Sequence, residues 1–366
     1  MGVGKRNFGL DILRAAAITG VFLSHELKLP IAGANMFANL GSGVELFFVL
    51  SGFLIGGICF RSLRDNNLTL WNLWRSRWWR TLPPYAAGIL FYLAIRPFHP
   101  PFGPLPWYYG VFLQNYLGVA GFGVSWSLCI EEHFYLCLPM VLLLSVRWAG
   151  LKSLRYLLPA LFPVSLILRL ATYWLTGGVP AQWFYLTHLH FEGLIVGVWM
   201  SYLLVFERPV FDRLRTWCRW LLPIPLVLVL VLPFWNPQPL LFDLFLFMLY
   251  ALGYAAWLRY IYDFRWEPVS RAGMLVRWCV TGTALCSYSI YLTHTTFDPW
   301  LRAMLEPMLT RGAFRSAVVL VATWTVGVMF YFLVERPTII SRDRYLKRAA
   351  PASAVKAVAS QCLTGK

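Results

Sequence analysis

Charged side chains are scarce in this sequence. Asp, Glu, Lys and Arg together make up 13% of its 366 residues, whereas a soluble domain carries about 25%. Apolar residues supply 59% of the chain and aromatic residues 17%, and the mean hydropathy is +0.60. This composition argues strongly against a soluble globular enzyme and predicts one polytopic membrane domain.

Close pairs of cysteines are lacking as well. The seven cysteines lie far apart, and no Cys/His cluster has the spacing of metal ligands, so neither a disulfide framework nor a metal site is predicted. A cleavable signal peptide is also not expected. Asp11 and Arg14 interrupt the first apolar run and no cleavage site follows it, which predicts a retained first membrane helix.

Apolar segments recur along nearly the whole chain, and about 20 residues suffice for a helix to cross a bilayer. They predict an all-α, polytopic integral membrane protein with about ten transmembrane helices. The segments are 9–28, 43–60, 83–95, 125–146, 157–174, 191–206, 220–235, 240–257, 276–293 and 316–334. The stretch 107–117 is too short to span and is predicted to be re-entrant or interfacial, with an eleventh crossing left open.

The chain carries 32 Lys and Arg against 16 Asp and Glu, a net charge of +16. Most of the basic residues fall in alternate loops, and basic residues that flank spans stay on the cytoplasmic side. Both termini are therefore predicted to be cytoplasmic, in a multi-pass protein of the cell inner (plasma) membrane. No basic stripe remains for nucleic acid. Residues 1–346 form the predicted transmembrane domain, and 347–366 a small, polar, disordered cytoplasmic tail.

Ionisable residues within apolar spans are costly, so each needs a partner, a cavity or a function. Arg14 and His25 are eleven residues apart, which places them on one face of the first helix, about 16 Å apart along its axis. An arginine near the inner surface can bind phosphate, and a histidine can move a proton near pH 7. The alternative is that Asp11 pairs with Arg14 while His25 joins two helices.

Two further segments combine polar groups with apolar runs. In SWSLCIEEHFYL, Ser127 and Glu131 lie at i and i+4 on one helix face, and a buried carboxylate there could orient an imidazole or share its proton. The second span has Gly52, Gly56 and Gly57 after Ser51, which favours close helix packing.

The loop 61–82 has five arginines interleaved with tryptophans. Three of them, Arg75, Arg77 and Arg80, could bind a polyphosphate group, although cytoplasmic topology and an aromatic belt explain the same pattern.

Six segments in this order resemble the acyltransferase 3 family, integral membrane acyltransferases related to enzymes that acetylate bacterial O-antigen, peptidoglycan, nodulation factors and macrolides. They are LDILRAAAITGVFLSH, GSGVELFFVLSGFLIGG, the basic segment before RTLPPY, SWSLCIEEHFYLCLP, SYSIYLTH and the ERP at 335–337. The family's arginine followed by an aspartate near the sixth span is replaced here by His190 and Glu192, so the resemblance assigns no role to this span.

The resemblance implies an enzyme that takes an acyl group, usually acetyl, from cytoplasmic acyl-CoA and places it on a hydroxyl of a sugar, glycan or glycosylated small molecule. Its expected partners are acyl-CoA, this carbohydrate acceptor and membrane lipid, with no metal. Some relatives carry a fused hydrolase-like domain, which is not expected in these 366 residues.

Acyl transfer needs a base, a binding site for CoA and donors for an oxyanion. We assign the base to His25 and its orienting partner to Glu131. Ser127 or His294 could contact the reacting carbonyl, and the predicted CoA-binding residues are Arg14, Arg75, Arg77 and Arg80.

Direct transfer and an acyl-enzyme route both remain open. Two alternative functions are a transporter or exporter of a sugar or lipid-linked substrate, and an inactive relative that senses or scaffolds.

Overall fold

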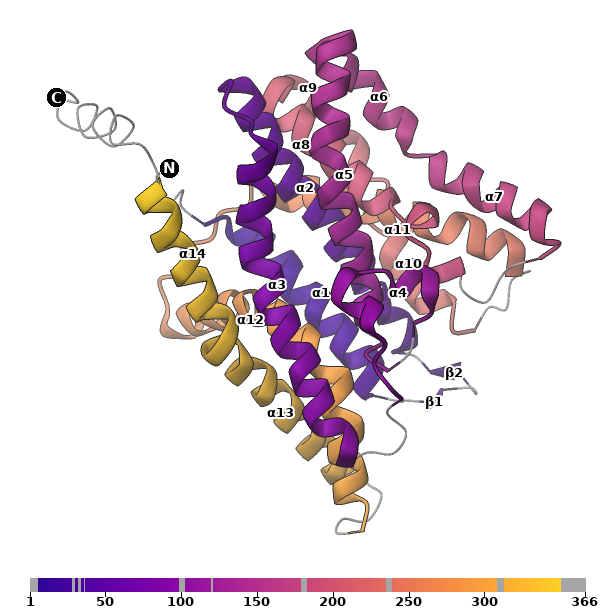
Figure 1. Ribbon diagram of the computed structural model, residues 1–366, viewed down its shortest axis with the longest axis vertical. Coiled ribbons are helices and arrows are strands. Elements are labelled where there is room, and N and C mark those ends of the chain that lie inside the picture. Colours follow the sequence, from indigo (N-terminus) through magenta and orange to yellow (C-terminus); the bar gives the residue numbers. More distant parts are fainter. Residues whose placement is uncertain are drawn as a thin grey trace.

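The computed structural model describes residues 6–27, 30–31, 34–35, 37–98, 103–119, 121–178, 183–234, 239–307 and 313–349, and these are helical almost throughout (Figure 1). The α-helices are α1 Phe8–Glu26, α2 Gly43–Arg64, α3 Leu70–Ile95, α4 Gln114–Leu117, α5 Ser125–Ala149, α6 Leu154–Leu161, α7 Val164–Thr176, α8 Glu192–Phe206, α9 Arg208–Cys218, α10 Ile224–Val231, α11 Pro239–Tyr262, α12 Arg271–Leu305, α13 Ala313–Phe330 and α14 Arg336–Ala349. The predicted all-α class is confirmed.

Short elements complete the description. Six 3₁₀ helices are η1 Ala38–Ser42, η2 Arg96–Phe98, η3 Trp107–Val111, η4 Leu151–Ser153, η5 Trp183–Tyr185 and η6 Thr187–Leu189, and a π-helical turn spans Tyr331–Glu335. Two-residue strands β1 (Pro30–Ile31) and β2 (Ala34–Asn35) pair antiparallel. The predicted re-entrant or interfacial stretch 107–117 consists of η3 and α4.

Among the described residues, six helical segments are long and apolar enough to cross a membrane: Phe8–Glu26, Asn39–Arg64, Ser125–Ala149, Leu151–Thr176, Leu244–Tyr262 and Phe314–Tyr345. The shorter apolar helix α8 adds a seventh apolar segment. The protein is therefore a multi-pass membrane protein, while the count of about ten stays a prediction.

One predicted span has a clear local reason to be shorter than expected. Within 220–235, the α-helix α10 covers eight residues, about 12 Å at 1.5 Å per residue. Pro223 and Pro225 lie at its start and Pro233 just after its end. Because proline has no backbone N–H to donate, these residues limit the helix at both ends.

The predicted disordered tail falls mainly outside the described residues. Residues 347–349 continue α14, and residues from 350 onward lie outside what the structure describes.

The packing of α2 on α8 depends on glycine. A methyl group at Gly52 would overlap the carbonyl of Leu194, and one at Gly197 would overlap the carbonyl of Val49. One at Gly56 would lie 3.1 Å from the Cα of Val198. The two backbones therefore approach each other as in small-residue membrane packing, and the packing role expected for Gly52 and Gly56 is confirmed.

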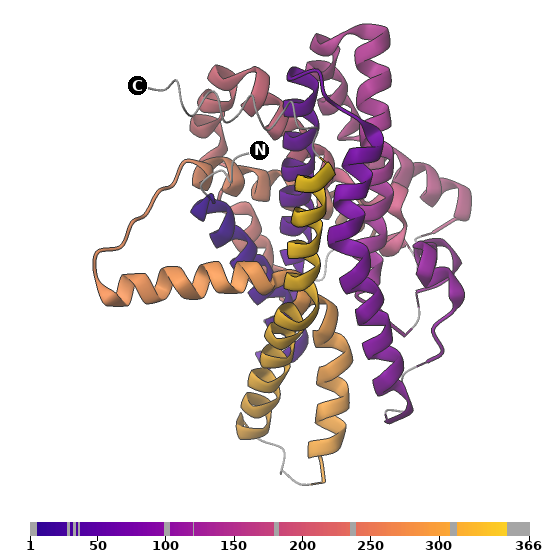
Figure 2. The ribbon, with the colours of Figure 1, turned by 60° about the vertical axis from the view of Figure 1, so that its left-hand side comes forward.

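Helix α12 links the remaining helices to this core. In Figure 2 its first part projects sideways from the bundle, while its later part runs beside α13. Helix α14 follows α13 upward and packs against α3. The later part of α12 also packs against α1, so it brings the SYSIYLTH segment close to the first helix.

Candidate active site

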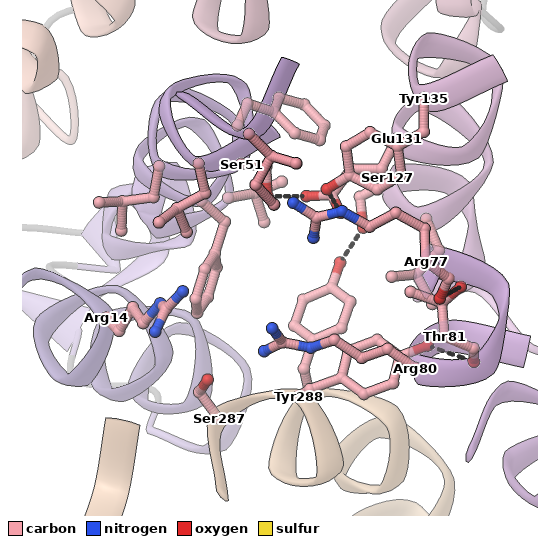
Figure 3. Close-up of a pocket in the computed structure, with 18 of the residues that line it drawn as sticks. Arg14, Ser51, Arg77, Arg80, Thr81, Ser127, Glu131, Tyr135, Ser287 and Tyr288 are labelled. Atoms are coloured by element: carbon pink, nitrogen blue, oxygen red, sulfur yellow. Dashed lines mark hydrogen bonds between the residues drawn. The ribbon is translucent and has the colours of Figure 1, made fainter. Parts of the chain in front are cut away.

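A cavity of about 240 Å³ lies between α1, α2, α3, α5, α12 and α14 (Figure 3). Its charged lining residues are Arg14, Arg77, Arg80, Arg342 and Glu131. In Figure 3, Arg14 enters from one side and Arg77 and Arg80 from the other, with their guanidinium groups directed into the same space. We call it the arginine cavity. Four arginines against one carboxylate make it suited to an anionic ligand.

The arginines of this cavity are largely free to bind a ligand. Arg14, Arg77 and Arg80 form no ion pair with any carboxylate that the structure describes. Asp11, the alternative partner considered for Arg14, instead pairs with Arg6 at 2.5 Å. A bound anion could therefore take up this positive charge.

Arg75 lies outside the arginine cavity, although it is on the same helix. Its guanidinium donates to the Oδ1 atom of Asn72 and to the hydroxyl of Tyr345, both at 3.3 Å. It also lies over the Tyr345 ring, 5.1 Å from the ring centroid. The structure thus brings together three of the four arginines predicted to bind CoA.

Glu131 also lines the arginine cavity, held between two hydroxyl groups. Ser51 donates to its Oε1 at 2.7 Å and Tyr135 donates to its Oε2 at 2.8 Å. The guanidinium of Arg77 lies over the Tyr135 ring at 5.2 Å. The expected contact with His25 is not formed, because α5 presents Glu131 to the middle of α2 whereas His25 lies at the far end of α1.

A second cavity, of about 590 Å³, contains His25, and we call it the histidine cavity. Polar lining groups come from Ser24, Ser42, Glu45 and Thr295. Its aromatic lining residues are Trp126, Phe184, Tyr185, Phe247, Tyr250 and Tyr291. Aromatic walls with a few polar groups are typical of small-molecule sites.

Among the described residues, only the Nδ1 nitrogen of His25 has a hydrogen-bond partner. Its Nδ1 lies 2.9 Å from the carbonyl oxygen of Val21. Because a carbonyl can only accept, Nδ1 carries the hydrogen, and the Nε2 of the neutral ring has the lone pair. His25 is exposed to its cavity, so this nitrogen can act as a base.

His294 stands beside His25, with ring centroids 5.1 Å apart. It is fully buried and its Nδ1 lies 2.9 Å from the carbonyl oxygen of Tyr291. Its Nε2 has no hydrogen-bond partner among the described residues. His294 lines neither cavity, so the structure places it behind His25.

The two cavities adjoin at Tyr291 and Val44, which line both of them. Ser127 lines the arginine cavity at this border, and its hydroxyl lies 2.5 Å from that of Tyr291. Arg14 and His25, which the sequence places on one helix face, thus face two adjoining cavities. Tyr291 was not among the predicted site residues. It lies in the SYSIYLTH segment three residues before His294, and this spacing places the two residues next to each other on a helix.

Comparison with known proteins identifies the family. A family model described as an acyltransferase domain matches residues 7–334. The chain belongs to this acyltransferase family. The peptidoglycan O-acetyltransferase OatA of Listeria monocytogenes is 26% identical over 368 residues, covering 90% of this chain and 55% of its own length.

A second relative of the same kind covers less of the chain. The O-acetyltransferase OatA of Staphylococcus aureus is 27% identical over 216 residues, 53% of this chain and 34% of its own length. The chain therefore spans about half the length, or less, of these curated relatives. No solved structure matches.

His190 and Glu192, at which this acyltransferase departs from the family pattern, each form a buried polar pair. The Nε2 atom of His190 lies 2.5 Å from Glu45. Glu192 forms an ion pair with Arg169 of α7, and both side chains are fully buried. Arg169 was not among the predicted site residues, although an arginine inside the apolar run 157–174 requires a buried partner.

The Glu45–His190 pair belongs to the wall of the histidine cavity. The second carboxylate oxygen of Glu45 is buried and has no partner among the described residues. The wall of this cavity thus contains a buried carboxylate oxygen without a described partner. No group of three or more His, Cys, Asp or Glu that could hold a metal occurs within the part of the chain that the structure describes.

Proposed function

We propose that this protein is an O-acyltransferase of the plasma membrane that moves an acyl group, usually acetyl, from cytoplasmic acyl-CoA to a hydroxyl of a glycan or other carbohydrate acceptor. One observation carries the proposal: a cavity lined by Arg14, Arg77 and Arg80, which form no ion pair with a described carboxylate, adjoins a cavity to which His25 is exposed. Both relatives are O-acetyltransferases by name, which supports acetyl as the transferred group.

The arginine cavity is the proposed donor site. Arg14, Arg77 and Arg80 would bind phosphate groups of acyl-CoA through charge-assisted hydrogen bonds. Glu131, fixed by Ser51 and Tyr135, would keep this basic cluster ordered and offset part of its charge. The basic loops predicted to be cytoplasmic adjoin this cavity through α3, in agreement with a cytoplasmic donor.

The histidine cavity is the proposed acceptor site. Its volume of about 590 Å³ and its aromatic walls suit a sugar ring. Ser24 could bind a hydroxyl group of the sugar. Because one relative is named a peptidoglycan O-acetyltransferase, a peptidoglycan glycan is the first acceptor to test.

In the proposed reaction, Nε2 of His25 removes the proton from the acceptor hydroxyl as its oxygen attacks the thioester carbonyl. The carbon–sulfur bond breaks and the acyl carbon stays on the acceptor oxygen. The proton passes from His25 to the departing CoA sulfur, so the enzyme ends in its starting state. Ser127 could donate to the oxyanion, and His294, behind His25, could share the proton.

The test compares His25→Ala with His188→Ala, using purified protein, acetyl-CoA and glycan acceptors. His188 is a matched control because it stacks on Tyr116 and lines neither cavity. CoA release would be measured with a thiol reagent and acceptor acetylation by mass spectrometry. We expect His25→Ala to lose about 10²- to 10⁴-fold in turnover, the usual contribution of a general base, while His188→Ala retains activity.

Two outcomes would contradict this proposal. Near wild-type turnover in folded His25→Ala would remove His25 from the role of base. Movement of an unmodified sugar across vesicles, without release of CoA, would identify a carrier instead of an enzyme.

A further inference from the structure

Tyr291 stands at the border between the two cavities. Among the described lining residues, it and Val44 are the two that both cavities share. Tyr291 is 6% exposed, and its ring packs against Phe47 and His294, with centroid distances of 6.3 and 5.7 Å. A bulky side chain therefore fills the place where the donor and acceptor sites would have to connect.

The hydroxyl of Tyr291 is fixed from both sides of this border. It lies 2.5 Å from the hydroxyl of Ser127, which lines the arginine cavity. It also donates to the carbonyl of Val124 at 3.2 Å, and Val124 lines the histidine cavity. These two hydrogen bonds hold the phenol across the passage.

Neighbouring residues of α12 follow the same path. Ser287 and Tyr288 line the arginine cavity, one turn before Tyr291, and Thr295 lines the histidine cavity, one turn after it. Tyr288 is tied to α3 by a hydrogen bond to the carbonyl of Thr81 at 3.1 Å. One helix thus runs beside both cavities, and Tyr291 is its side chain at the junction.

We propose that Tyr291 is a gate between the donor and acceptor cavities, held closed by Ser127, that keeps water away from the acyl thioester until the acceptor is in place. This inference rests on the proposed function. A hydroxyl of the acceptor that reaches the junction from the histidine cavity can exchange hydrogen bonds with the hydroxyls of Ser127 and Tyr291. By taking these hydrogen bonds it would release the phenol and connect the two cavities.

The gate has a defined chemical consequence. Without it, water in the histidine cavity could attack the thioester in place of the acceptor. The carbon–sulfur bond would then break with the acyl group on the water oxygen, giving a carboxylic acid and CoA. Loss of the gate should therefore increase CoA release without acceptor, relative to transfer.

The first experiment measures both rates in purified full-length protein with acetyl-CoA, with and without a glycan acceptor. We expect Tyr291→Ala to raise the ratio of hydrolysis to transfer at least about tenfold, equivalent to roughly 1.4 kcal/mol in relative barrier height. Tyr291→Phe and Ser127→Ala, which remove hydrogen bonds but keep the ring, should give smaller increases. An unchanged ratio in folded Tyr291→Ala would overturn the proposal.

Tyr85→Phe is the matched control for these variants. It removes another buried tyrosine hydroxyl, which donates to the backbone carbonyl of Tyr109 at 3.0 Å. Tyr85 and Tyr109 line neither cavity. Its ratio of hydrolysis to transfer should equal that of the wild type. If this ratio rises as much as in Tyr291→Phe, loss of any buried tyrosine hydrogen bond explains the effect and the gate is contradicted.

A second experiment needs no activity and so separates the gate from the proposed function. A thiol is introduced in the arginine cavity by Ser287→Cys, and vesicles of both orientations are treated with a membrane-impermeant maleimide. Labelling at position 287 is read by peptide mass spectrometry. From the face to which the histidine cavity opens, we expect labelling only when Tyr291→Ala is also present.

Labelling from that face with Tyr291 intact, or its absence when Tyr291 is removed, would overturn the gate. If the labelling is as expected but the wild type never releases CoA, the gate stands and the proposed function fails.

Discussion

At His25, one backbone contact determines which nitrogen is available for chemistry. The bond from Nδ1 to the Val21 carbonyl leaves Nε2 with the lone pair. A second buried imidazole, that of His294, lies behind it. The residue type was visible in the sequence, but the protonated nitrogen was not, because it depends on a contact within the folded helix.

Arg80 and Arg75 provide a test of the donor site at the residue scale. Both are on α3, but Arg80 lines the arginine cavity and Arg75 lies against Tyr345. A hydrogen bond to a charged group contributes about 1.5 to 3 kcal/mol. We therefore expect Arg80→Gln to raise the KM for acyl-CoA by roughly 10- to 100-fold, with little change in the KM for the acceptor.

The matched variant Arg75→Gln should leave the KM for acyl-CoA within about twofold, because it removes the same charge outside the cavity. Steady-state kinetics at saturating acceptor would measure both values. Equal increases in the two variants would mean that the general positive charge of α3 attracts the donor, rather than the cavity itself.

At the scale of elements, the contact between α2 and α8 decides where several site residues stand. Helix α2 carries Ser51, which holds Glu131, and Glu45, which contacts His190. Its close approach to α8 relies on Gly52 and Gly197. The distance between these helices therefore affects both cavities.

Gly52→Val should destabilise the protein, because the new side chain would overlap the Leu194 carbonyl. Overpacking of this kind costs about 1 to 3 kcal/mol. The matched control is Gly282→Ala in α12, where an added methyl group meets nothing within 4 Å and should stabilise the helix by up to about 1 kcal/mol. Thermal unfolding in detergent would measure both, and equal Tm values for Gly52→Val and the wild type would contradict the packing role.

At the scale of the whole molecule, the two cavities make the proposed reaction directional. The arginine cavity adjoins the basic helix α3, while His25 lies at the opposite end of α1 from the basic N-terminal residues. Acyl-CoA should therefore be accepted from one side of the membrane, which the distribution of Lys and Arg predicts to be the cytoplasmic side.

Proteoliposomes of known orientation would test this prediction. With acetyl-CoA and acceptor on opposite sides, transfer should occur only when acetyl-CoA is on the side of the basic loops, and detergent should remove the difference. Equal transfer from both sides would contradict a fixed donor side.

The sequence by itself determined the all-helical membrane class and the family, because apolar runs, basic loops and short motifs are local in the chain. It also pointed to Arg14, His25 and Ser127, because polar groups in apolar spans need a reason to be there, and to Arg77 and Arg80, because the segment 61–82 is rich in arginine. The prolines that limit α10 were also present in the sequence, but the predicted span 220–235 extends past them.

Only the tertiary structure decided which of these groups share a cavity. It paired Glu131 with Ser51 and Tyr135, placed Arg75 outside the arginine cavity and His294 behind His25. It also set Tyr291 at the junction of the two cavities. These relations depend on the position and rotation of helices distant in sequence, and the packing of α2 on α8 and of α12 on α1 fixes them.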